Sequence, residues 1–208
     1  MSLHRQQIHE LLLQSLEAEL GGVQVYEVAL ECAINDDLRE EWQRYLDETE
    51  RHVEVMQQLC ATCGVDPDAE TPGRAVVRQI GEALVSAITL AKETGTPEGA
   101  QIAAAECVVL AETKDHLDWE LIGRVAVQLE GDEAQALRLA YAEIEDEEDE
   151  HLYHTRGWLR ELWIQSFGMP AVLPPPEEVR HVETAIGAAR AEQSREGMLK
   201  KRGRSGER

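Results

Sequence analysis

Aromatic residues are scarce in this chain of 208 residues. It contains a single Phe, Phe167, and Phe, Trp and Tyr together make up only 4% of the sequence. Leu, Ala and Glu are used heavily instead, and side chains of this kind lose little rotamer freedom in a helix. Strands favour β-branched and aromatic residues. We therefore expect an all-α protein.

Long apolar runs and a dense set of cysteines are also missing. No segment approaches the ~18 apolar residues that a membrane helix needs, and no basic N-terminal segment leads into an apolar stretch. We therefore expect neither a membrane span nor a signal peptide. The four cysteines, Cys32, Cys60, Cys63 and Cys107, are too few for a disulfide scaffold. Together these absences predict a soluble, cytoplasmic protein.

Positive charge is in short supply, except at the C-terminus. The chain has 20 Lys and Arg against 41 Asp and Glu, a formal net charge of −21. The segment from Arg195 to Arg208 has the opposite balance, with six basic residues and two acidic ones. An acidic body repels nucleic acid and attracts cations. We do not expect a nucleic-acid partner, and a solvated acidic surface is the simplest interpretation of the charge.

Apolar residues at helical spacing predict four long helices in two pairs. In the first pair, one helix covers about residues 3–34, and the next begins at a cap at 35–37 and reaches about 63. In the second pair, the helices cover about 97–130 and 132–167. The link within each pair is short, whereas the link between the pairs contains a helix at about 74–93. A stiff Pro-rich linker then precedes an amphipathic helix at about 177–194. We divide the chain into a helical bundle (1–168), a linker with its helix (169–195) and a basic disordered tail (196–208).

The two halves of the chain resemble each other at their acidic residues. Glu19 is followed seven residues later by Tyr26, and Glu112 by Trp119 at the same spacing. Seven residues make nearly two helical turns, so each Glu shares a helix face with its aromatic residue.

A second correspondence links the second and fourth long helices. One reads Asp47-Glu-Thr-Glu-Arg-His52 and the other Asp146-Glu-Glu-Asp-Glu-His151. In the latter, Glu148 and His151 form a Glu-x-x-His motif on one helix face. A buried pair of divalent metals needs this mixture of carboxylates and imidazoles. Seven of the eight residues from 143 to 150 are acidic, however, so a solvated acidic face would explain much of the same run.

On these motifs, residues 10–167 resemble the ferritin-like superfamily of bacterioferritin, rubrerythrin and manganese catalase. The stretch from Glu19 to Tyr26 is especially similar to the first helix of bacterioferritins. The resemblance implies an up-down-down-up four-helix bundle with a helix in the long crossover and an appended C-terminal helix. It also implies one Glu from each of the first and third helices, and one Glu-x-x-His from each of the second and fourth.

Carried over to this sequence, the pattern implies a set of six metal ligands. They are Glu19, Glu48, His52, Glu112, Glu148 and His151. Glu48 departs from the family pattern, because it stands four residues before His52 rather than three. Thr49 occupies the position three residues before His52, where the pattern has a Glu. Three versions stay open at this point: a di-metal site with altered geometry, a single-metal site, or a fold that has lost its metals.

The resemblance implies a function in redox chemistry. Two iron or manganese ions would react with dioxygen or peroxide, as in a di-iron or di-manganese oxidoreductase. The alternative is a metal-free or single-metal scaffold that binds a protein partner, for instance through the C-terminal helix. Iron storage in a shell is less favoured, because the additional helices would crowd the packing faces of a cage. A homodimer is expected on base rate.

Several other residues allow more than one interpretation. His116, one turn after Glu112, could be a ligand, a hydrogen-bond partner of one, or a core histidine. We place His154 at the edge of the site, and treat Tyr26 as core or as a partner of a ligand carboxylate. Cys60 and Cys63 could be a redox pair, half of a zinc site, or incidental.

Overall fold

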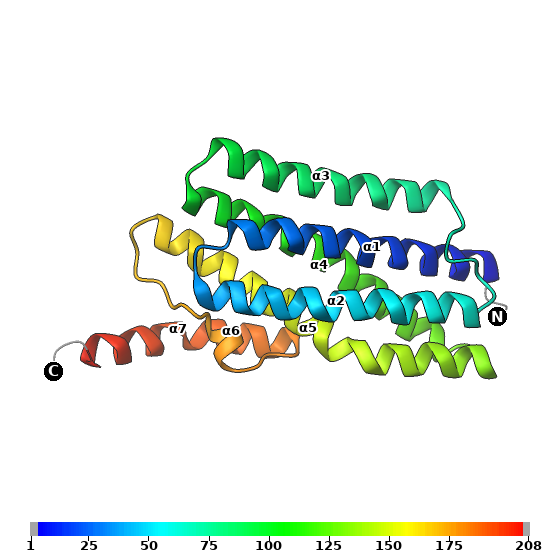
Figure 1. Ribbon diagram of the computed structural model, residues 1–208. Coiled ribbons are helices and arrows are strands. Elements are labelled where there is room, and N and C mark those ends of the chain that lie inside the picture. Colours follow the sequence, from blue (N-terminus) through cyan, green and yellow to red (C-terminus); the bar gives the residue numbers. More distant parts are fainter. Residues whose placement is uncertain (1–3, 206–208) are drawn as a thin grey trace.

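The structure, a computed structural model, describes residues 4–205, and every regular element in this range is a helix (Figure 1). The helices are α1 (Arg5–Cys32), α2 (Asp36–Thr62), α3 (Pro72–Thr94), α4 (Pro97–Ala126), α5 (Asp132–Ser166), α6 (Pro176–Val179) and α7 (Ala185–Ser205). The prediction of an all-α protein is thus confirmed. Over the same range, no helix combines the length and the apolar character needed to cross a membrane.

The helices begin at capping residues that are recognisable in the sequence. The side chain of Asn35 accepts a hydrogen bond from the amide of Leu38 (3.2 Å), and the hydroxyl of Thr96 accepts one from the amide of Gly99 (3.1 Å). These side chains satisfy amides that have no partner inside the helix. At Gly131, just before α5, φ is 83°, a value that glycine adopts without strain. α4 ends at Ala126, four residues earlier than the sequence predicts.

The C-terminal region differs more from the prediction. Instead of one helix over 177–194, the chain forms the short α6, a turn at 180–184, and then α7. The helix is interrupted where the amide of Val182 donates to Nε2 of His154 on α5 (3.1 Å), next to His181 with φ 48°. α7 then continues to Ser205, into the segment for which the sequence predicts disorder. Residues 206–208 of that segment lie outside the described part.

The long helices pack side by side (Figure 1). α1 contacts α2, α3 and α4, while α5 contacts α2 and α4. α3 lies along the outer side of α1 and α4, and it returns the chain to the end of the molecule where α2 begins (Figure 1). α6 and α7 pack against α5. Four long helices, α1, α2, α4 and α5, therefore surround a common interior.

That interior contains two apolar clusters. One includes Tyr26, Trp42 and Trp158, and the other includes Leu16, Met56 and Ile122. Buried acidic and histidine side chains from all four long helices also lie in this interior. Charged groups are costly to bury unless something compensates them, so this polar set is the natural place to look for a function.

Candidate metal centre

The buried polar set contains two groups of potential metal ligands that share one residue. The first group is Glu19, His52 and Glu148, and the second is Glu112, His151 and Glu148. Within each group the candidate ligand atoms lie within 4.8 Å of one another. All five side chains are buried, with at most 3% of each residue exposed. α1 and α4 each supply one Glu, α2 supplies a His, and α5 supplies both a Glu and a His.

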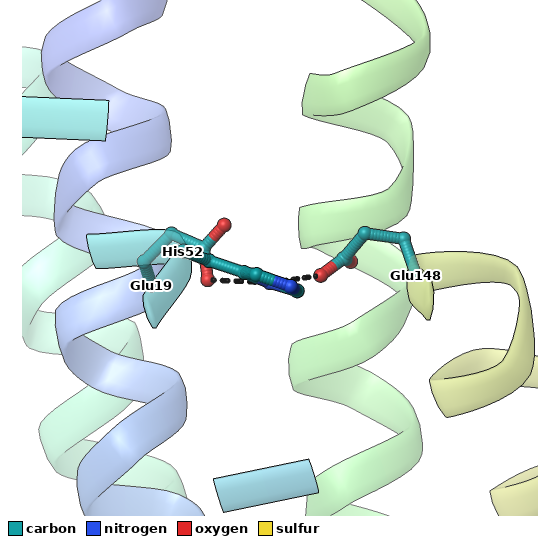
Figure 2. A group of neighbouring side chains, drawn as sticks. All are labelled: Glu19, His52 and Glu148. Atoms are coloured by element: carbon teal, nitrogen blue, oxygen red, sulfur yellow. Dashed lines mark ion pairs between the residues drawn. The ribbon is translucent and has the colours of Figure 1, made fainter. Parts of the chain in front are cut away.

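In the first group, His52 lies between two carboxylates (Figure 2). Its Nδ1 atom is 2.9 Å from Oε1 of Glu148 and 3.6 Å from Oε2 of Glu19. Glu148 extends toward the imidazole from the opposite side of the bundle to Glu19 (Figure 2). The three side chains thus come from three different helices and converge on one point.

The second group has a similar geometry around His151. Its Nδ1 atom is 3.6 Å from Oε2 of Glu112 and 3.8 Å from Oε1 of Glu148. The imidazoles of His151 and His52 are stacked, with 5.6 Å between ring centroids. Glu148 can therefore serve both groups, as a carboxylate that bridges two adjacent ions does.

The other nitrogen of each imidazole is held by a glutamate from the opposite helix. Nε2 of His151 is 2.9 Å from Oε2 of Glu48, and Nε2 of His52 is 2.8 Å from Oε2 of Glu147. The structure therefore places Glu48, one of the six candidate ligands, outside both groups. A hydrogen bond to the far nitrogen fixes the orientation of an imidazole and the nitrogen it presents to a metal. Glu147, which no motif in the sequence indicated, contacts the far nitrogen of His52 as Glu48 contacts the far nitrogen of His151.

Several buried atoms at the centre make no aligned hydrogen bond, although Nδ1 of His52 lies close to Oε1 of Glu148. They are Nδ1 of His52, Nδ1 of His151, and Oε2 of Glu19, Glu112 and Glu148. Nearly all buried polar atoms in proteins are hydrogen-bonded, because burial without a partner costs free energy. Here five of them gather where two ligand groups meet. Imidazole nitrogens and carboxylate oxygens are donors that suit iron and manganese, so this set of residues fits a metal centre.

Without a metal, the histidines carry the compensating charge. Burial disfavours the charged form of His52, but Glu19, Glu147 and Glu148 outweigh it and raise the pKa of His52 well above its usual value. In the same way, burial lowers the pKa of His151, while Glu112 and Glu48 raise it to about 9. Burial raises the pKa of Glu148 to about 7. Protons on the two imidazoles thus offset part of the negative charge of the carboxylates around them.

Thr49 occupies the place where the family pattern has a fourth glutamate. It is buried, and its hydroxyl donates to the backbone oxygen of Tyr45 on its own helix (2.8 Å). Its methyl group faces Gly22 of α1. Thr49 therefore offers no donor to either ligand group, and the centre is asymmetric.

A carboxylate that the sequence analysis missed lies close to the centre. Asp115 on α4 is buried, and its Oδ1 atom has no hydrogen-bond partner. Burial raises the pKa of Asp115 well above its usual value, and the charges of Glu19 and Glu148 add to the effect. Asp115 stands three residues after Glu112, on the same helix face, and this spacing was the available signal.

Two aromatic residues lie near ligand carboxylates of the facing helix. Nε1 of Trp119 on α4 donates to Oε1 of Glu19 on α1 (2.7 Å). In the reverse direction, Tyr26 on α1 is completely buried, and burial together with Glu112 on α4 raises its pKa well above the usual value. The seven-residue spacing found in both halves of the sequence thus places each aromatic residue near the glutamate of the other half.

His154 lies outside both ligand groups, inside a second polar network that adjoins them. Its Nδ1 atom is 3.0 Å from Oε1 of Glu41 and 3.0 Å from the hydroxyl of Tyr45. The Tyr45 ring lies against His151, with 4.2 Å between centroids. Trp158 donates to Glu41 from the other side (3.2 Å). The outer nitrogen of His154, Nε2, accepts a hydrogen bond from the backbone amide of Val182.

The remaining candidates lie away from the ligand groups. His116 is partly exposed, and its Nδ1 atom is 3.2 Å from Oδ1 of Asp149. Cys60 and Cys63 are buried and free, and burial raises the pKa of each thiol to about 11. Thiols with such a pKa are protonated at neutral pH and are poor nucleophiles. These two cysteines are best explained by packing in the apolar cluster around Met56.

Comparison of the chain with known protein families, with curated proteins and with solved structures finds no match.

Proposed function

We propose that this protein is a ferritin-like metalloprotein that holds two iron or manganese ions and reacts with dioxygen or peroxide. The observation that carries the proposal is the set of five buried ligand atoms without an aligned hydrogen bond, gathered where the two groups meet. One ion would be held by Glu19, His52 and Glu148. The other would be held by Glu112, His151 and Glu148.

The arrangement of the helices supports this proposal. α2 and α4 begin at the same end of the molecule, because α3 spans the crossover between them (Figure 1). A bundle with one long crossover is the connectivity of ferritin-like folds, in which metal ligands project inward from facing helices. The centre receives ligands from the same four helices that this connectivity brings together.

The balance of charge also favours two ions. Glu19, Glu112, Glu148 and Asp115 are all buried, and together they carry four negative charges when ionised. Two divalent cations balance four charges, whereas one leaves a large excess in a medium of low dielectric constant. Asp115 thus provides the negative charge that a glutamate at position 49 would have provided.

The protein residues around the centre would position the ligands and exclude water. Glu48 and Glu147 hold the far nitrogens of the two imidazoles, so that each Nδ1 atom faces the carboxylates. Trp119 fixes one oxygen of Glu19 and leaves the other free. Tyr26 and Tyr45 cover His151 with their rings. Bound iron or manganese would supply the redox chemistry with dioxygen or peroxide.

A single-metal centre is the second candidate, and Thr49 favours it. The threonine offers no donor, so the ion near His52 has only Glu19 and the shared Glu148 as its carboxylates. The number of ions per chain separates the two candidates.

The test is elemental analysis of protein produced with iron and manganese supplied, together with two variants. His151→Ala removes a ligand, whereas His116→Ala removes a histidine outside the ligand groups and serves as the matched control. We expect about two iron or manganese atoms per chain in the wild type and in His116→Ala, with a large loss in His151→Ala. One atom per chain would support the mononuclear centre. No metal in any of the three proteins would refute both candidates and favour a metal-free scaffold.

A further inference from the structure

A pocket of about 380 Å³ lies beside the candidate centre, between α4 and α5. Thr184 and Ala185, at the beginning of α7, also line it. Its size is typical of sites that bind small molecules. We refer to it as the α4–α5 pocket.

The α4–α5 pocket reaches the centre through two of its lining residues. Glu148, which both ligand groups share, lines the pocket, and its buried Oε2 atom has no partner. Trp119 also lines the pocket and donates to Glu19. A molecule in this pocket would therefore contact the residue that both ligand groups share, whose carboxylate is turned toward His52.

The rest of the lining combines negative charge with aromatic rings. Carboxylates come from Glu120, Glu145 and Asp149, and rings come from Trp119, Tyr141 and Tyr153. None of the lining residues is Lys or Arg, but Glu120 is paired with Arg124 one turn further along α4. Carboxylates attract a cation, and aromatic faces stabilise it further, particularly when it also carries apolar groups.

Two contacts give the pocket its form. The ring of Tyr141 lies against α4 at Gly123, where a β-carbon would be 2.8 Å from the ring. The Tyr141 hydroxyl donates to Glu145. His116 is the one lining residue able to carry positive charge, and it is paired with Asp149. Tyr141 and Glu145 are thus held in place by the fold itself.

The lining suits an organic cation better than a metal ion. Among the described residues, the groups of three donors within 4.8 Å are the two at the centre, and neither includes Glu120, Glu145 or Asp149. These carboxylates are therefore spread around the pocket rather than gathered on one point. A metal ion needs several donors on a single point, whereas a larger cation can contact carboxylates and rings that are further apart.

We propose that the α4–α5 pocket binds a small organic cation, an amine with an apolar body, and places it next to Glu148. The idea that the bound amine is a substrate rests on the proposed metal centre. The binding of the amine to the pocket does not. Metal-free protein can therefore test it separately.

The experiment is calorimetric titration of the full chain with three probes of matched shape: benzylammonium, benzyl alcohol and benzoate. Metal is first removed with a chelator, which is then dialysed away. We expect benzylammonium to bind at least tenfold more tightly than benzyl alcohol, and benzoate not to bind. The double variant Glu145→Gln/Asp149→Asn should weaken the binding of benzylammonium about tenfold. Glu54→Gln, an exposed glutamate on α2 outside this pocket, is the control and should leave it unchanged.

Four outcomes would overturn the proposal. They are no binding of benzylammonium, equal binding of the alcohol and the ammonium, no effect of the double variant, or a double variant that slows manganese uptake without changing amine binding. The last result would make the pocket a route for metal ions. Amine binding in a protein that takes up no metal would support the pocket and refute the proposed centre. Metal uptake without amine binding would do the reverse.

Discussion

Thr49 of α2 packs its methyl group against Gly22 of α1, with 3.3 Å between Cγ2 and the position that a β-carbon on Gly22 would take. Relative to His52, Thr49 stands where Glu148 stands relative to His151. Relative to Glu19, Gly22 stands where Asp115 stands relative to Glu112. The half of the centre formed by α1 and α2 therefore has no acidic residue at the positions that correspond to Asp115 and Glu148 in the half formed by α4 and α5.

This relationship predicts the effect of Thr49→Glu. The new carboxylate would be buried without a partner in metal-free protein, so we expect the free energy of unfolding to fall by about 3 kcal/mol. Metal should restore more stability to this variant than to the wild type, because it neutralises the added charge. Chemical denaturation with and without manganese measures both effects. Equal losses in the two conditions would mean that the side chain turns away from the centre.

Removal of Glu48 tests its role as a positioning residue. In Glu48→Ala the far nitrogen of His151 loses its acceptor, and loss of such a partner typically weakens metal binding about 10–100-fold. Glu50→Ala, which removes an exposed glutamate two residues further along α2, is the control and should bind metal normally. Competition with a coloured chelator gives the affinities. If Glu48 is instead a direct ligand, the number of bound ions should fall as well as the affinity.

Metal should stabilise the folded protein, because the ligand atoms converge only in the folded state. Manganese at one hundred times its dissociation constant adds about 2.7 kcal/mol, which for a chain of this size raises the melting temperature by about 5–10 °C. The Glu148→Gln variant removes the shared carboxylate, so its melting temperature should rise far less. A melting temperature that does not respond to manganese in the wild type would contradict the coupling of metal and fold.

A shared proton at Glu178 predicts a pH dependence in the polar network of Glu41 and His154, beside the centre. Burial and the charge of Glu41 raise the pKa of Glu178 to about 9. Burial opposes ionisation of Glu41, but hydrogen bonds from His154 and Glu178 outweigh it and lower the pKa of Glu41 to about 2. The folded state thus keeps a proton on Glu178 that the unfolded state releases near its ordinary pKa. Stability should therefore fall as the pH rises through that ordinary value toward 9.

The variant Glu178→Gln separates this effect from other titrations. Its amide can donate to Glu41 at any pH, so we expect the wild type to lose roughly 5 °C more in melting temperature than the variant between pH 6 and pH 9. Glu192→Gln, an exposed change on α7, should behave like the wild type. Parallel curves for all three proteins would show that Glu178 does not hold the proton.

The helices could largely be predicted from the sequence, because their signals are local. The Thr96-Pro97 start and the glycine at 131 depend on neighbouring residues alone. The interruption between α6 and α7 could not be predicted, because it depends on Val182 meeting His154, a residue 28 positions away. Propensity favours one continuous helix there, and a tertiary hydrogen bond overrides it.

The centre could be predicted only in part, for a similar reason. Spacing within a helix identifies the face that Glu148 and His151 share, and the structure brings both to the centre. Spacing cannot show which oxygen meets which nitrogen across the bundle, so it does not reveal that Glu48 and Glu147 each contact the far nitrogen of an imidazole. In an acidic run such as 143–150, neighbouring glutamates look alike in the sequence, and only packing distinguishes them.

The hydrogen bond from the Val182 amide to His154 also has a consequence for the order of folding. His154 contacts Tyr45, and Tyr45 packs on His151, so the interior reaches its final form only when residue 182 is in place. During synthesis on the ribosome, the four long helices emerge well before that residue. In a chain that grows from its N-terminus, the outer nitrogen of His154 therefore gains this partner only after the four long helices have been synthesised.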